Sequence, residues 1–213
     1  MSFVKQSLLL LLLAAVSTYA TTEDCDGLNR TLPISDFHKI LGNWVLVWAV
    51  SDTENFEMEN FTNSHVEIHL QSDNVTVSYD ERNFYSATNS CVFYQSTLKN
   101  PTDKHVVHID DMMEEKNGIN TLLNDNGTVQ VFKTEDDSMV VLYRGNSGHY
   151  LLIHRREGDH TDFAKTSKSH DRFLKLSDCL SVRSAYLYTL KDTRDFCHMK
   201  SATAKASGGA ASQ

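Results

Sequence analysis

Long apolar runs are almost absent from this chain of 213 residues. The one unbroken run, 8–15, follows a lone Lys5 and precedes the exit 18–20, which is the pattern of a cleavable secretory signal. A membrane anchor is the alternative, but the run is shorter than the roughly 20 residues that a spanning helix needs. We therefore expect a signal peptide over 1–20, a secreted and extracellular mature chain, and no membrane insertion.

Positive charge is also scarce, with 20 Lys and Arg against 28 Asp and Glu and a formal net charge of -8. This balance argues against nucleic acid as a partner and provides no basic face for an anionic membrane. The sequence shows no internal repeat and no linker. We expect a single domain over 21–200 and a disordered tail over 201–213, which is small and polar without periodicity.

Catalytic and metal-binding motifs are missing as well. The turn Gly145–Gly148 lacks the Gly-x-Ser-x-Gly elbow of a nucleophile, and neither His-Glu-x-x-His nor a phosphate-binding glycine loop occurs. His65 and His69 would share a strand face, but four residues along a strand span about 13 Å, too far for one ion. The spacing is no better suited to binding one ion in two other pairs, His105 with His108 and His149 with His154. We expect no enzyme, no cofactor and no metal site.

Short runs rich in Val, Ile, Tyr, Phe and Thr dominate from Gly42 to about His154. Clusters of Asn, Asp, Gly and Ser separate them, which is typical of an all-β chain. The turns Asn126-Gly127 and Gly145–Gly148 supply the residues that hairpins require. The predicted strands are Asn43–Ser51, His65–Ser72, Val75–Asp80, Cys91–Leu98, His105–Ile109, Thr128–Lys133, Met139–Tyr143 and His149–His154.

One helix is predicted over Lys168–Leu180, where Phe173, Leu176 and Leu180 recur at spacings of three and four. A last strand, Ala185–Leu190, follows it. Evenly spaced strands closed by one helix and a final strand fit an eight-stranded, up-and-down antiparallel barrel better than a sandwich. Such a barrel is wide enough to hold one small ligand.

Two modifications agree with the secretory route. The four cysteines all lie beyond the signal, and an even number in an exported chain predicts two disulfides with three possible pairings. Four Asn-x-Ser/Thr acceptors would mark exposed turns if glycosylated. These acceptors are Asn29, Asn60, Asn74 and Asn126.

The segment before the first predicted strand, Asp36 to Trp44, resembles the first signature of the lipocalins, Gly-x-Trp after an apolar lead-in. Gly42 would allow a tight turn into the strand, and Trp44 would close one end of the barrel. An ordinary core tryptophan is the alternative reading. Asp162-Phe163 and Arg183 are candidates for the remaining signatures of the family.

Three further segments resemble the α1-acid glycoprotein branch of the lipocalins: Cys91–Tyr94, Asn126–Thr128 and Asp178–Leu180 before Cys197. In overall layout the chain is similar to the fish plasma subgroup that binds tributyltin or saxitoxin and tetrodotoxin. The stretch between Lys99 and Asp125 is longer than in the mammalian protein and would be either a lid or a disordered loop. The resemblance implies a calyx with one helix packed outside and disulfides joining Cys25 to Cys179 and Cys91 to Cys197. Each would close a loop of more than a hundred residues, worth on the order of 5 kcal/mol.

The pocket wall follows from strand alternation. If Trp44 faces inward, the two-residue period places Leu46, Trp48 and Val50 on the same inner face. On the other strands the sequence does not fix which face points inward. The candidate wall residues there are Phe93 or Tyr94, Phe132, Tyr143, and Leu152 or His154. Core packing is the alternative for each of them.

The resemblance implies a secreted plasma carrier that sequesters a small hydrophobic or amphipathic ligand, for example a xenobiotic or toxin such as tributyltin, in the barrel cavity. The alternative is an acute-phase type glycoprotein that modulates immune responses through its surface and glycans. An enzyme of this family would need a free barrel thiol, whereas all four cysteines are expected to be paired. The sequence makes no prediction of oligomeric state.

Overall fold

The structure is a computed structural model that describes residues 30–53, 61–73, 76–98, 106–124, 126–132, 137–146, 148–182 and 185–198. It contains ten strands and a short helical region. The strands are β1 Gly42–Ser51, β2 Phe61–Leu70, β3 Val77–Tyr85, β4 Ser90–Leu98, β5 Val107–Lys116, β6 Ile119–Leu123, β7 Thr128–Phe132, β8 Ser138–Gly145, β9 Gly148–Arg156 and β10 Tyr186–Thr189. The helices are the 3-10 helices η2 Ile34–Ile40 and η3 Asp159–Thr161 and the α-helices α3 Phe163–Lys168 and α4 His170–Cys179.

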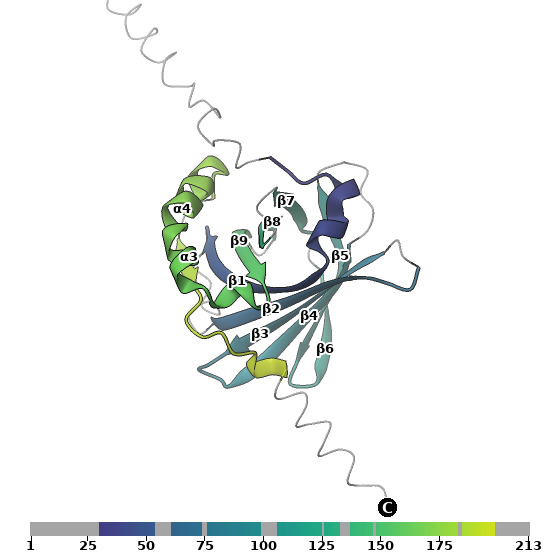
Figure 1. The fold of residues 1–213 in the computed structure, drawn as a ribbon. Coiled ribbons are helices and arrows are strands. Elements are labelled where there is room, and N and C mark those ends of the chain that lie inside the picture. The colour runs from purple at the N-terminus through teal and green to yellow at the C-terminus, as the bar shows by residue number, and fades with distance from the viewer. Residues whose placement is uncertain are drawn as a thin grey trace, which may run out of the picture.

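Eight of the strands form a closed antiparallel barrel (Figure 1). They follow one another in the order β1-β2-β3-β4-β5-β7-β8-β9, and β9 pairs with β1 to complete the ring. Two strands lie outside this ring: β6 pairs with β5, and β10 pairs with β1. The expected eight-stranded barrel with a C-terminal helix outside it is confirmed.

The stretch between Lys99 and Asp125 contains a hairpin that the sequence did not predict. Strands β5 and β6 pair from Met112–Leu123 to Lys116–Ile119, and a turn at Asn117-Gly118 with positive φ joins them. Strand β6 is exposed over most of its length. Its sequence, Ile-Asn-Thr-Leu-Leu, does not alternate between apolar and polar residues, which is why the pattern missed it.

Several expectations fall on residues outside the described ranges. These include the signal over 1–20, the tail over 201–213, and the acceptors Asn29, Asn60 and Asn74. Asn126 is described and exposed just before β7. None of the helices formed by the described residues is both long and apolar enough to cross a bilayer.

One end of the barrel is closed by η2 and Trp44. The Trp44 side chain is buried, and its Nε1 donates to the Ile40 carbonyl at 2.7 Å. The Arg156 guanidinium lies 3.9 Å from the centre of the Trp44 ring and donates to the Leu41 carbonyl at 2.6 Å. Gly42 has a φ of 112°, and a Cβ there would meet Arg156 Nη1 at 2.8 Å. The expected tight turn and inward tryptophan are therefore present, and Arg156 pairs with that tryptophan.

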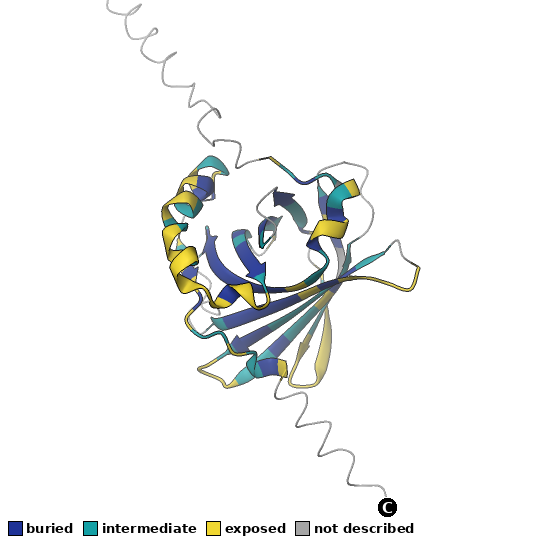
Figure 2. Cartoon of the chain, in the orientation of Figure 1, coloured by how far each residue is buried: buried dark blue, intermediate teal, exposed yellow. Residues whose placement is uncertain are grey.

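Helix α4 covers the outer face of β1, β8 and β9. Its buried Leu176 joins a hydrophobic cluster with buried residues of these strands, including Val140, Leu142, Leu151 and Ile153. Figure 2 shows β1 and β9 buried, whereas the side of α3 and α4 that faces away from the barrel is exposed. The outer faces of these strands are therefore buried under the apolar side of the helix.

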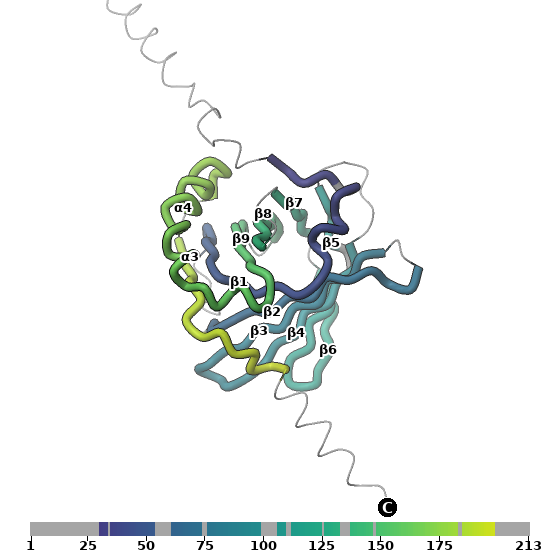
Figure 3. Tube along the Cα trace, viewed as in Figure 1, coloured from purple at the N-terminus to yellow at the C-terminus, as the bar shows by residue number. Residues whose placement is uncertain are grey.

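A C-terminal segment, 191–198, starts near α3 and runs along the outside of β2 and β3 (Figure 3). We call it the strap. A disulfide between Cys91 and Cys197, with Cα atoms 5.6 Å apart, anchors it to β4 and confirms one expected pairing. The other pairing involves Cys25, which lies outside the described residues; no described cysteine is free.

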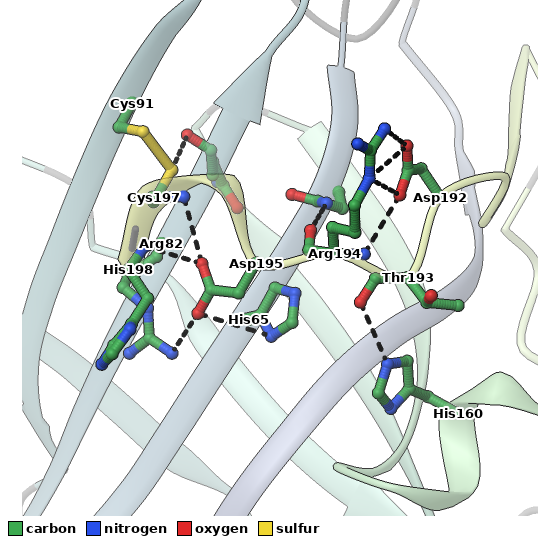
Figure 4. Close-up of polar contacts among 12 residues, drawn as sticks. His65, Arg82, Cys91, His160, Asp192, Thr193, Arg194, Asp195, Cys197 and His198 are labelled. Carbon is green, nitrogen blue, oxygen red and sulfur yellow. Dashed lines mark hydrogen bonds and ion pairs between the residues drawn. A yellow bond between two sulfur atoms is a disulfide. The ribbon is translucent and has the colours of Figure 1, made fainter. Parts of the chain in front are cut away.

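Polar contacts hold the rest of the strap (Figure 4). Asp195 Oδ2 accepts from Arg82 Nη2 at 3.0 Å and lies 3.8 Å from His65 Nδ1. The Asn63 amide donates to the Arg194 carbonyl at 2.6 Å. His160 Nδ1 accepts from the Gly158 amide, so its Nε2 carries the proton and donates to the carbonyl of the neighbouring strap residue, Thr193, at 3.3 Å. The strap is thus fixed by charge and hydrogen bonds as well as by the stacking of its Phe196 on the buried Phe84 of β3, with ring centres 4.5 Å apart.

Candidate functional site

A cavity of about 390 Å³ occupies the barrel interior. This volume is in the range of small-molecule sites. Its wall includes residues of η2 and of all eight ring strands together with one residue of β6. The residues are Ile40, Leu46, Phe61, Ile68, Tyr79, Glu81, Asn83, Tyr85, Tyr94, Ser96, Leu98, Ile109, Met112, Glu114, Leu123, Val129, Val131, Met139, Val141, Tyr143, Tyr150 and Leu152.

Three of the residues expected in the wall are there. Leu46, Tyr143 and Leu152 line the cavity from β1, β8 and β9. Of the alternatives that the register left open, Tyr94 lines the cavity and Phe93 does not. Tyr143 also lies against Gly127, where a Cβ would approach its ring to 2.5 Å, so this glycine allows the ring its position.

The position expected for Trp48 and Val50 is wrong. The pairing of β1 with β9 changes register between Leu46 and Trp48, so alternation reverses at that point. Trp48 pairs with Ile153 on the outer face, and its ring lies 5.4 Å from that of Phe173 in α4. Its Nε1 donates to His170 Nδ1 at 3.1 Å. Val50 joins the same cluster beneath the helix.

Phe132 and Phe93 also lie outside the cavity wall. Val129 and Val131 of β7 face the cavity, which places the adjacent Phe132 in the cluster beneath α4. Phe93 follows the same rule beside the inward Tyr94. Aromatic character makes both residues candidates for the wall, but one step along a strand moves a side chain to the opposite face.

Sequence reasoning missed two carboxylates that lie inside the barrel. Glu81 and Glu114 both line the cavity, and no lysine, arginine or histidine is among its described lining residues. Charged residues in strands usually face water, so the pattern assigns them to the outer face. The alternation of Tyr79, Glu81, Asn83 and Tyr85 along β3 is the only signal that could have found them.

The two carboxylates flank a tyrosine in a row across three strands. Tyr94 of β4 is the cross-strand partner of Glu81 in β3 and of Glu114 in β5. Cross-strand partners share a face, and strands two apart in a sheet are separated by about 10 Å. Glu81, Tyr94 and Glu114 therefore form a continuous polar band, which we call the acidic wall.

Hydroxyl groups orient this wall. Ser64 Oγ donates to Glu81 Oε1 at 3.1 Å, and the Tyr79 hydroxyl donates to Glu81 Oε2 at 2.8 Å. The Tyr94 hydroxyl is hydrogen-bonded to the Glu114 side chain. Burial, reinforced by the neighbouring carboxylates, raises the pKa of both the Tyr79 and the Tyr94 phenol, so both remain protonated donors.

Asn83 extends the acidic wall by one inward position along β3. Its side chain is 6% exposed and lines the cavity, and its Oδ1 has no hydrogen-bond partner among the described residues. A buried amide oxygen without a donor costs about 1–3 kcal/mol. This oxygen is therefore an acceptor available to a ligand.

His154 lies on the same inner face as its partners Leu46 and Met139 but is not part of the cavity wall. It is 2% exposed, and its Nδ1 has no described partner. Burial lowers the pKa of His154 to about 3, so the imidazole is neutral at physiological pH. It adds no positive charge near the cavity.

Metal ligands do not gather anywhere in the described part of the chain, where no group of three His, Cys, Asp or Glu side chains is placed to hold an ion. His65 instead faces the strap residue Asp195, and His69 pairs with Asp80 at 3.5 Å on the surface.

A closed eight-stranded barrel with an internal cavity, one end shut by a Gly-x-Trp segment and a C-terminal helix outside, is the architecture of the lipocalin fold. Among solved structures, the barrel is similar to a siderocalin, Ex-FABP, with a TM-score of 0.50 and 16% identity over 72% of this chain and 95% of that one. It is also similar to a biogenic amine-binding protein, with a TM-score of 0.58 and 10% identity over 83% and 93%. At these identities the likeness shows the fold alone.

The sequence is related to a particular group. It is 36% identical over 207 residues to saxitoxin and tetrodotoxin-binding proteins 1 and 2 of Takifugu pardalis, an alignment that covers 94% of this chain and 52% of each relative. The chain thus spans about half the length of these relatives. No family model matches the chain. The expected resemblance to lipocalins of the toxin-binding subgroup is confirmed.

Proposed function

We propose that this chain is a secreted plasma carrier that binds and sequesters a small amphipathic molecule, such as a toxin or other xenobiotic, in the barrel cavity. The observation that carries the proposal is the cavity of about 390 Å³ with its mixed apolar and polar wall. The names of the two relatives, which specify saxitoxin and tetrodotoxin, support a toxin as cargo. These relatives are binding proteins, which favours a carrier over an enzyme.

The expected affinity follows from the area that such a ligand buries. About 300 Å² of apolar surface at roughly 25 cal/mol per Å² contributes on the order of 7 kcal/mol before the costs of association. Apolar burial alone therefore gives dissociation constants no tighter than about micromolar. The ligand is held inside the barrel by Leu46, Tyr94, Tyr143 and Leu152, which share the cavity wall.

The direct test is displacement of a neutral fluorescent probe, N-phenyl-1-naphthylamine, by saxitoxin, tetrodotoxin and tributyltin. Intrinsic tryptophan emission is a weaker reporter because Trp48 lies outside the cavity. Val141→Trp places a large ring in the cavity wall and should abolish binding of the probe. Asn120→Trp adds the same ring to exposed β6 and should leave it unchanged.

Absence of saturable binding by the probe and by all three ligands would contradict the carrier proposal and favour the glycoprotein alternative.

Secretion and glycosylation are tested by a separate experiment. Expressed in eukaryotic cells, the full chain should appear in the medium with Thr21 at its N-terminus. It should lose mass on treatment with an N-glycosidase, and Asn126→Gln should remove one glycan because this residue is exposed.

A further inference from the structure

We propose that the strap is an acid-sensitive clasp, which is closed while His65 and His160 are neutral and opens in its middle when these histidines take up protons. The inference goes beyond the proposed function, since it concerns the outside of the barrel and involves no ligand. Opening uncovers the outer faces of β2 and β3, on which the strap lies, so the barrel presents a different surface in acid.

Two histidines from different elements lie side by side beneath the strap (Figure 4). His65 of β2 is 3% exposed and His160 of η3 is 6% exposed, and their ring centres are 6.1 Å apart. His65 faces the Asp195 carboxylate of the strap, and His160 faces the Thr193 carbonyl. The ordinary pKa of histidine, about 6.5, lies close to physiological pH, so a buried pair of histidines can act as a proton sensor.

The contacts of His160 require the neutral form of its ring. Its Nδ1 accepts from the Gly158 amide at 3.1 Å, while its Nε2 donates to the Thr193 carbonyl at 3.3 Å. Only a neutral imidazole offers one acceptor and one donor, because the charged ring carries a proton on both nitrogens. Protonation therefore replaces the bond from Gly158 by two opposed N–H groups. None of the described ion pairs gives His160 a carboxylate in return.

The surroundings of His65 also disfavour a proton. Its Nδ1 lies 3.8 Å from Asp195 Oδ2, beyond hydrogen-bond distance, and its buried Nε2 has no partner among the described residues. Asp195 and Glu157 attract a positive charge on this ring. Arg82 and His160 repel it, and Arg82 already donates to Asp195 at 3.0 Å. Burial outweighs the attraction and lowers the pKa of His65 below its ordinary value.

Both ends of the strap are tethered, so only its middle can lift. The Cys91–Cys197 disulfide holds one end, and at the other the Leu190 amide donates to the Val47 carbonyl at 3.0 Å. In the open state, histidines in water take up protons near pH 6.5. The closed state is therefore stable above that pH and loses stability as the pH falls below it. At pH 5 the ratio of closed to open falls by up to roughly 30-fold for each histidine that stays neutral in the closed state.

The test is hydrogen exchange of the full secreted chain, followed by mass spectrometry at pH 7.5 and pH 5 and corrected for the intrinsic effect of pH. The Cys197 and His198 amides donate to Asp195, which the closed clasp holds in place. We expect the strap peptide to exchange at least about 10-fold faster at pH 5. Strands β8 and β9 should remain protected on the same time scale, because they open only with the whole barrel.

Glutamine variants identify the sensor. His160→Gln can keep both hydrogen bonds, since an amide accepts from Gly158 and donates to Thr193, but it takes up no proton. With His65→Gln in the same chain, strap exchange at the two pH values should agree within about 2-fold. His69→Gln is the matched control. It removes a half-exposed histidine from the same strand, so the pH response should remain.

Three results would overturn the clasp. The first is unchanged strap exchange between the two pH values, and the second is an equal pH response in the unaltered chain and the double variant. The third is strap exchange that rises only together with exchange of β8 and β9, since acid then unfolds the whole barrel. Near-ultraviolet circular dichroism identifies a variant that fails to fold, and the comparison of the strap with β8 and β9 needs no variant.

Discussion

The two sides of the barrel differ on both their inner and their outer faces. The wall formed by β7, β8, β9 and β1, here called the aliphatic wall, is lined inside mainly by aliphatic side chains together with Tyr143 and Tyr150, and it is backed outside by Trp48 and helix α4. The wall formed by β3, β4 and β5 carries Glu81 and Glu114 inside and is backed by the strap, through the Cys91–Cys197 disulfide and Asp195. The polar wall thus has covalent and ionic support in addition to the stacking of Phe196 on Phe84, whereas the aliphatic wall is supported mainly by packing.

This contrast has a physical reason. A partly buried carboxylate must keep its hydrogen bonds and its position, since a misplaced acceptor loses the bonds that compensate its desolvation, whereas aliphatic contacts tolerate small shifts. The aliphatic wall obtains its stability from area removed from water, which is non-directional. The two sides are therefore stabilised by different kinds of interaction, so variants on each side test different contributions to the free energy of unfolding.

Removing the disulfide should have the largest effect on stability. Cys91→Ser with Cys197→Ser opens a loop with a sequence separation of 106, and the free energy of unfolding should fall by on the order of 5 kcal/mol. Urea unfolding followed by circular dichroism measures it. A loss below about 1 kcal/mol would show that the polar contacts of the strap suffice without the bond.

Trp48→Ala tests the backing of the aliphatic wall. Removing a fully buried tryptophan should lower the free energy of unfolding by about 4 kcal/mol, and it also leaves His170 without its indole donor. The same urea titration measures it. The folded variant should still bind N-phenyl-1-naphthylamine, because Trp48 is absent from the cavity wall; loss of probe binding would contradict the placement outside the barrel.

Acidification should weaken the aliphatic side more than the polar side. The pKa of His154 is lowered to about 3 by burial, so the unfolded chain takes up this proton first, near pH 6.5, and stability falls below that pH. Between pH 7.5 and 5 we expect a loss of about 2 kcal/mol from this residue. Urea titrations at both pH values should show that His154→Gln removes most of this change.

His65→Gln is the counterpart on the polar side. Burial lowers the pKa of His65 as well, but the nearby Asp195 opposes the shift, so the variant should remove less of the pH dependence. If His65→Gln and His154→Gln reduce the pH dependence of stability equally, the predicted difference between the two sides is wrong.

Asp195→Asn should have the smallest effect. It removes the carboxylate that accepts from Arg82 and faces His65, and the expected loss is about 1 kcal/mol because the group is partly exposed. Thermal or urea unfolding measures it. Asp192→Asn is the control, since that residue pairs only with its exposed neighbour Arg194, and it should change stability less.

Much of the fold could be predicted from the sequence because its signals are local. Alternating Val, Ile, Tyr and Phe predicted the ring strands, Gly42 and Trp44 predicted the closed end, and Phe173 with Leu176 predicted the helix. The disulfide between Cys91 and Cys197 came from the family resemblance. These features depend on backbone propensity and on residue type, which the chain carries in itself.

The tertiary structure alone decided which side chains enter the cavity. A single change of register after Leu46 reverses every later position of β1, so Trp48 lies beneath the helix instead of in the calyx. Glu81 and Glu114 face inward although their polarity predicts the opposite, because pairing through Tyr94 sets their face. Residue type states a preference for water or for the core, but closure of the barrel fixes each strand's register, and register determines the face.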